Sequence, residues 1–216
     1  VTPSSVSVSG SSVTFTLANT FAARQFIVIG TVQKTGTTNT EKTKTLNTAT
    51  ITFTTQATAG GPTLALGKSD GWRVTSILMQ SGTFAAPGGT YNIDISDRYE
   101  FDNGQKQTYY DICKLTLKDT YIPPSAPVQV ILEYFTHSTG DYCSVKSYPA
   151  DVAYSDIPAI LRDSLDFRPR IDDTGLLFSG SGAATLIPKR GQDIRTDFTY
   201  YLARKEKIAL DINGNF

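Results

Sequence analysis

Hydrophobic and polar residues alternate along much of this chain, and that period predicts short β-strands rather than helices. Alternation appears at residues 6–8, 13–17 and 49–53, and residues 26–32 are almost continuously apolar. The Thr- and Lys-rich tract 34–47 has no apolar period, which predicts an exposed hairpin tip. Short strands at this spacing favour a sandwich of the immunoglobulin or fibronectin type.

The central stretch, residues 100–148, contains three further strand-like segments, and residues 72–80 and 91–95 precede it with two more. Prolines lie between the first and the second of the three central segments, and a turn at 138–141 precedes the third segment. One parity in the central segments is apolar and the other is largely polar, as a half-buried antiparallel sheet requires. The apolar set is Tyr109, Cys113, Leu115 and Leu117 in one segment and Val128, Val130, Leu132 and Tyr134 in the next.

The pattern changes after Tyr148. Asp156 and Pro158 predict the start of a short helix, with Asp156 as N-cap and Ile160, Leu161 and Leu165 on one apolar face. The Gly- and Ser-rich residues 171–192 predict an extended segment, and 198–210 a further strand.

We therefore expect an all-β fold: immunoglobulin/fibronectin-like antiparallel β-sandwich modules with an irregular, strand-containing C-terminal segment. The Gly-rich segment 57–62 predicts a boundary. It would divide the chain into a module at 1–60, a central sandwich at 61–150 and an irregular extension at 151–216.

The charge and hydrophobicity of the chain bear on the kinds of partner to expect. Twenty basic and twenty acidic residues give a formal net charge of zero, so nothing favours nucleic acid or an anionic membrane surface as a partner. No apolar run approaches the roughly 20 residues that a membrane-spanning helix needs, so no membrane insertion is expected. The chain begins at Val1 and ends just after the turn dipeptide Asn213-Gly214, which suggests an excised piece of a longer polypeptide.

Catalytic and metal-binding patterns are weak. His137 is the single histidine, and a triad with Ser138 and Asp141 lacks the sharp nucleophile turn, so a surface or strand-end histidine is favoured. A zinc site with Cys113 and Cys143 lacks paired ligand spacing, and two buried free thiols are favoured over a disulfide. We expect no enzyme activity, no catalytic residue, no cofactor and no metal.

Two groups of residues remain as candidate contact sites. Asp166, Arg168, Arg170 and Asp172 form the densest charged cluster, in which bidentate pairs would act as an internal clamp or as a latch to a neighbouring subunit. The paired tyrosines at 109–110 and 200–201 each place one ring outward by parity, so Tyr110 and Tyr201 are candidate exposed aromatics.

Several phrases, taken in order, resemble a known family. They are 94–99 (DISDRY), 101–105 (FDNGQ), 109–111 (YYD), 133–137 (EYFTH), 147–148 (SY), 156–158 (DIP), 165–169 (LDFRP) and 200–205 (YYLARK). Over roughly residues 72–216 the chain resembles large virion structural proteins, baseplate or tail-fibre-like, of contractile-tailed, T-even-like cyanophages, which often carry a domain of unknown function.

The resemblance implies a non-enzymatic structural component of a phage virion, assembled in the host cytoplasm and contacting other virion proteins or other copies of itself. It names no catalytic residue that could be transferred to this chain. The alternative is a receptor- or glycan-binding module of a phage tail or a cell-surface adhesin, whose partner would be host surface glycan.

Overall fold

The computed structural model describes residues 3–9, 12–19, 39–175 and 191–194. Antiparallel strands dominate it, and the expectation of an all-β fold is confirmed. The immunoglobulin or fibronectin topology stays a prediction. The strands are β1 (Ser5–Ser9), β2 (Ser12–Thr16), β3 (Lys44–Phe53), β4 (Thr63–Ser69), β5 (Gly71–Gly82), β6 (Pro87–Asp94), β7 (Tyr99–Asp102), β8 (Ile112–Leu117) and β9 (Val128–His137).

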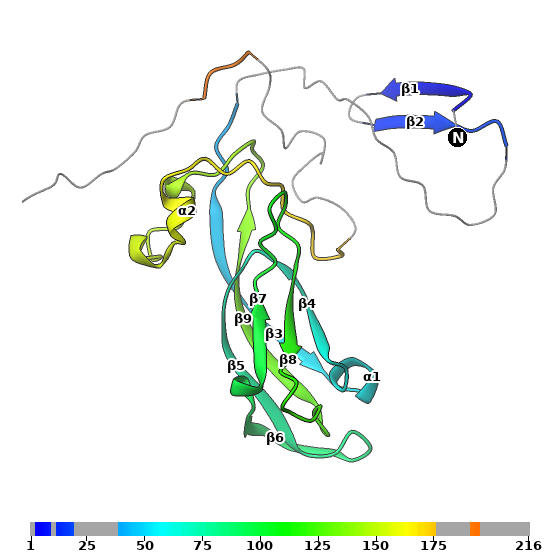
Figure 1. Cartoon of the computed structure of the whole chain (residues 1–216), viewed down its shortest axis with the longest axis vertical. Helices are drawn as coiled ribbons and strands as arrows, with labels where there is room; N and C mark the ends of the chain where they lie inside the picture. Colours follow the sequence, from blue (N-terminus) through cyan, green and yellow to red (C-terminus); the bar gives the residue numbers. More distant parts are fainter. Residues whose placement is uncertain (1–2, 10–11, 20–38, 176–190, 195–216) are drawn as a thin grey trace, which may run out of the picture.

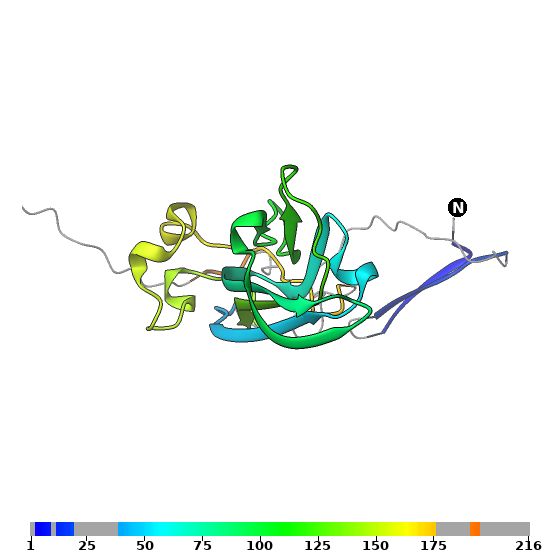
Figure 2. The same ribbon diagram turned by 90° about the horizontal axis from the view of Figure 1, so that it is seen from below.

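Two sheets form the central sandwich (Figures 1 and 2). One has four strands in the order β3-β9-β5-β6, and the other has three in the order β4-β8-β7. The strands β1 and β2 form a separate two-stranded hairpin, in which Val8 pairs with Val13.

The core lies between the two sheets, and apolar residues on the predicted inward faces of β8 and β9 contribute to it. Cys113, Leu115 and Leu117 of β8 and Val128, Val130 and Leu132 of β9 are all buried. Their partners from the remaining elements are Phe53, Ala59, Leu64, Leu66, Ile77, Ile95 and Tyr99. Gly71 allows the sheets to approach, because a Cβ there would lie 2.6 Å from the Phe101 ring and 2.8 Å from the Cys113 sulfur.

Strand direction brings five segments to one end of the sandwich. The start of β3 pairs with the end of β9, since Lys44 lies opposite His137. The turn between β4 and β5, the loop 103–111 between β7 and β8, and the chain that follows β9 lie at the same end. Residues 142–171 continue from β9 there, and Figure 1 shows α2 at this end, away from α1. Polar residues that are distant in sequence therefore meet.

Three sequence predictions are corrected. The boundary near residue 60 does not separate two modules, because β3 pairs with β9 along ten consecutive residues and belongs to the central sheet. The predicted hairpin tip at 34–47 is wrong at its end, where Lys42 and Lys44 are buried and β3 begins; residues 34–38 lie outside the described residues. The third central strand is absent from the described chain, and isolated bridges at Tyr142 and Cys143 and a short 3₁₀ helix, Val145–Ser147, take its place.

The helices are short: α1 is Gln56–Ala59 and α2 is Ala159–Arg162, and 3₁₀ turns occupy Ser96–Arg98, Val145–Ser147 and Tyr154–Asp156. The predicted helix exists, but Pro158 and not Asp156 is its N-cap, and Ile160 is 79% exposed while Leu161 is buried. Among the described helices, none is long and apolar enough to cross a membrane.

Candidate functional site

A buried ion pair lies where the five segments meet. The ammonium of Lys44, at the start of β3, lies 2.8 Å from Oδ2 of Asp70, in the turn between β4 and β5, and neither side chain is exposed. Nε2 of His137, the last residue of β9, lies 2.6 Å from the same carboxylate oxygen. A carboxylate only accepts hydrogen bonds, so the imidazole must donate through Nε2. Gln105 donates to the other oxygen of Asp70 at 3.2 Å.

Aromatic rings enclose the Lys44 ammonium. It lies 4.6 Å from the ring centroids of Tyr110 and Tyr148 and 5.4 Å from that of Phe135. Both tyrosine hydroxyls also accept hydrogen bonds from it at 3.3 Å. The negative faces of the rings attract a cation, and the rings exclude water from it.

The pair keeps its charges through mutual stabilisation. Burial acts to raise the pKa of Asp70, but the Lys44 ammonium and the hydrogen bond from His137 hold that pKa well below its usual range. Burial acts in the opposite sense on Lys44, and the Asp70 carboxylate nevertheless raises the Lys44 pKa well above its usual value. Burial lowers the pKa of His137 to about 4, against the opposing effect of Asp70, so the ring is neutral near pH 7.

A second ion pair, with a buried carboxylate and a partly exposed guanidinium, adjoins the first. Arg168 donates to both carboxylate oxygens of Asp166, at 2.9 and 2.8 Å, and to the backbone oxygen of Lys106 at 2.8 Å. Its guanidinium carbon lies 4.4 Å from the Tyr110 ring centroid, and the Tyr110 hydroxyl donates to Asp166. Burial acts to raise the pKa of Asp166, and the hydrogen bonds from Arg168 and Tyr110 outweigh it and lower that pKa. Tyr110 therefore connects the two ion pairs.

Backbone hydrogen bonds fix the same segment. Cys143 and Asp166 exchange two, at 2.7 and 2.8 Å, and Tyr110 receives one from Ile171 and donates one to Pro169, both at 2.9 Å. The buried Arg170 side chain donates to the backbone oxygen of Phe135 at 3.0 Å. The hydroxyl of Ser69 in β4 donates to the backbone oxygen of Ile171 at 2.6 Å, so residues 142–171 are attached to both sheets.

We call the set Lys44, Asp70, Tyr110, His137, Asp166 and Arg168 the end cluster. Of the four residues predicted as a clamp or latch, Asp166, Arg168 and Arg170 make these internal contacts. The fourth, Asp172, accepts hydrogen bonds from the backbone and hydroxyl of Thr174 in its own turn.

The expectation for Tyr110 is corrected, because this ring is fully buried and not exposed. Parity did not apply, since β8 begins at Ile112 and Tyr110 lies in the loop before it, folded back by bridges to Gln105 and Arg170. Tyr201 lies outside the described residues.

His137 stands at a strand end as predicted, but its side chain is only 3% exposed, so it is not a surface residue. Both cysteines are free and buried, as expected. Burial raises the pKa of Cys113 to about 12 and that of Cys143 to about 11, which keeps both as thiols. No group of three or more His, Cys, Asp or Glu within the described ranges is arranged to hold a metal ion.

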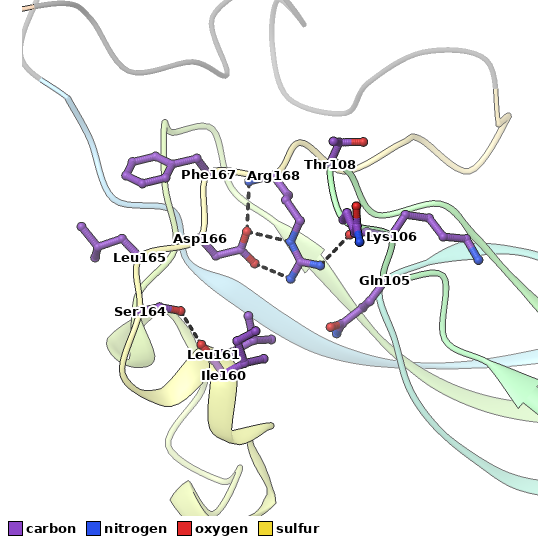
Figure 3. A pocket seen from close by; sticks show the side chains of 11 residues that line it. Gln105, Lys106, Thr108, Ile160, Leu161, Ser164, Leu165, Asp166, Phe167 and Arg168 are labelled. Atoms are coloured by element: carbon purple, nitrogen blue, oxygen red, sulfur yellow. Dashed lines mark hydrogen bonds and ion pairs between the residues drawn. The ribbon is translucent and has the colours of Figure 1, made fainter.

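Beside the cluster is an open groove of about 700 Å³ between the loop 105–108 and residues 160–168 (Figure 3). Polar side chains of the loop form one wall. The other wall includes Ile160, Leu161 and Phe167, and the Asp166–Arg168 pair lies between them (Figure 3). Phe167 is 37% exposed, so one aromatic ring is accessible there.

The sequence patterns did not point to Lys44 or Asp70, and they offered His137 only the wrong partners, namely Ser138 with Asp141 or the two cysteines. No local signal marks the pair, because Lys44 and Asp70 are 26 residues apart. Asp70 occupies the turn between β4 and β5 with a φ of 54°.

Comparison with known proteins adds no identity. A scan against protein-family models, a search of curated proteins and a search of solved structures each found no match.

Proposed function

We propose that this chain is a non-enzymatic structural component of a phage tail, baseplate or tail fibre, in which a β-sandwich with a locked end supplies a rigid module and subunit contacts. One observation carries the structural part of this proposal. The charged and aromatic residues of the end cluster are bonded to one another, all but the partly exposed Arg168 have buried side chains, and they attach residues 142–171 to the sandwich.

Chemistry on a bound substrate requires groups that can reach it. In the end cluster the Asp70 carboxylate already accepts hydrogen bonds from Lys44, His137 and Gln105. Such mutual satisfaction favours a clamp, because a buried charge pair that lost one partner would be strongly destabilised. The virion assignment rests on the resemblance of the ordered phrases between residues 72 and 216.

The test is mass spectrometry of purified virions from the phage that encodes the chain. The proposal predicts peptides from this chain at a fixed copy number per particle, retained after washing in high salt. Their absence from virions, with the protein present in the lysate, would refute the virion role.

A second candidate, recognition of a surface glycan, is favoured by the groove. The amide side chains of Gln105 and Gln107 and the accessible ring of Phe167 all line it, and sugars bind to such combinations of hydrogen-bonding groups and apolar rings. A glycan array probed with the wild-type chain and with Phe167→Ala distinguishes the two. Glycan binding that Phe167→Ala abolishes would favour glycan recognition over the structural role. The absence of binding to any glycan on a broad array would refute glycan recognition.

A further inference from the structure

The side chains of Lys44 and Asp70 are in direct contact and are enclosed by the protein. A primary amine and a carboxyl group lie 2.8 Å apart, N to O, with both side chains fully excluded from solvent. Three aromatic rings surround the nitrogen, and His137 and Gln105 hold the carboxylate. Lys44 begins β3 and Asp70 lies in the turn between β4 and β5, so their contact is a product of folding.

We propose that Lys44 and Asp70 condense in the folded protein to an intramolecular amide bond between Nζ and Cγ. This covalent cross-link would join the start of β3 to the turn between β4 and β5. It does not depend on the virion role, since the reaction requires only the fold.

The reaction balances without any further reagent. One proton of the Lys44 ammonium passes to the Asp70 carboxylate along their hydrogen bond, giving a neutral amine and a carboxylic acid. The nitrogen lone pair then adds to Cγ, and the bond between Cγ and one carboxyl oxygen breaks. That oxygen leaves as water with two of the three ammonium protons, and the amide nitrogen keeps the third.

The surroundings favour the addition of nitrogen to Cγ. The preceding proton transfer is uphill, because the folded state raises the pKa of Lys44 and lowers that of Asp70, so this transfer limits the rate. Fixed contact between the reacting groups replaces a bimolecular encounter, which raises the effective concentration greatly. The N–H of His137 points at Oδ2, 2.6 Å from Nε2, where negative charge develops as the nitrogen adds.

A competing reaction also releases water. Asp70 precedes Gly71, and the backbone nitrogen of the glycine could attack the same carboxyl to give a cyclic imide. In the structure that N–H donates to the backbone oxygen of Asn103 at 3.0 Å, and is held there rather than near its own side chain. The experiment must nevertheless separate the two products.

The first measurement is the intact mass of the purified 216-residue chain after denaturation. The cross-link predicts a mass lower by one water than the sequence gives, and Lys44→Arg should restore the full mass while keeping the charge. A full mass in the wild type would overturn the proposal and leave an ion pair. A water loss that persists in Lys44→Arg would assign it to the imide, and overturn the proposal equally.

Peptide mapping decides the matter even if Lys44→Arg fails to fold. Trypsin should not cut after Lys44 when its amine is acylated, so peptide 43–68 should be joined to peptide 69–73. This product has the same mass as the uncut linear peptide 43–73, so fragment ions are needed to identify it. A series beginning at Ser69 together with one beginning at Thr43 supports the cross-link, and a single series from Thr43, or free peptide 45–68, refutes it.

Discussion

Replacing Arg168 by alanine tests whether the end cluster holds residues 142–171 in place. The substitution removes two hydrogen bonds to Asp166, one to the Lys106 backbone and one to the Tyr110 hydroxyl at 3.1 Å. It also leaves the Asp166 carboxylate, 8% exposed, without its cation. Removing one partner of a buried ion pair costs about 3–5 kcal/mol. Because the Arg168 side chain keeps 18% exposure, we expect the lower end, about 3 kcal/mol.

The loss should be local, and Cys143 can report it. Its backbone pairs with Asp166 and its thiol is buried, so labelling requires this segment to open. A loss of about 3 kcal/mol corresponds to a roughly 100-fold faster labelling of Cys143 by a thiol reagent in native buffer. Cys113, buried in the core between the sheets, serves as the internal reference, with both thiols followed by mass spectrometry.

Arg73→Ala is the matched control. Arg73 pairs with Glu133 at 2.6 Å, but its side chain is 65% exposed, and exposed pairs contribute at most about 1 kcal/mol. It should leave both labelling rates nearly unchanged. If Arg168→Ala also left the Cys143 rate unchanged, or accelerated both thiols equally, the clamp would not act on residues 142–171 as argued.

Two further predictions follow from burial. The folded state lowers the pKa of the single histidine, His137, from 6.5 to about 4, so the unfolded chain binds the extra proton first and stability falls as the pH drops through this window. Between pH 7.5 and 5 this group should account for a loss of about 2 kcal/mol in urea unfolding, and His137→Gln should lose less than wild type by that amount; equal losses would show the histidine to be accessible. Leu161→Ala should destabilise by about 2 kcal/mol, whereas Ile160→Ala, at a side chain 79% exposed, should change stability by less than about 0.5 kcal/mol, and comparable urea midpoints for the two variants would contradict the placement of α2.

Alternation predicted the sandwich well where strands are regular. In β9 the residues Val128, Val130 and Leu132 enter the core as their parity requires, because a strand with one buried face must alternate. The segment that ends at Tyr148 is predicted as a strand, and this prediction is wrong. A 3₁₀ helix, Val145–Ser147, forms there in place of strand pairing.

The end cluster could not be predicted in the same way, because it depends on contacts between distant residues. Lys44 and Asp70 are 26 residues apart, and Tyr110 and Asp166 are 56 apart. The direction of the strands brings these residues together at one end of the sandwich. A local sequence pattern does not predict which turns lie at the same end. The charged residues at 166–170 were recognised as a group, but their partners in other segments were not.

Backbone hydrogen exchange of the native chain tests the central claim most directly. The amides of Tyr110 and Ile171 join residues 142–171 to the loop before β8, and those of Cys143 and Asp166 join the two ends of this segment to each other, at 2.7 to 2.9 Å. If the end cluster fixes residues 142–171 to the sandwich, these four amides should exchange nearly as slowly as those of Val130 and Leu132 in β9. Arg168→Ala should then accelerate their exchange selectively. Exchange at the rate of an open loop in the wild type would contradict the account, because residues 142–171 would then not be fixed to the sandwich.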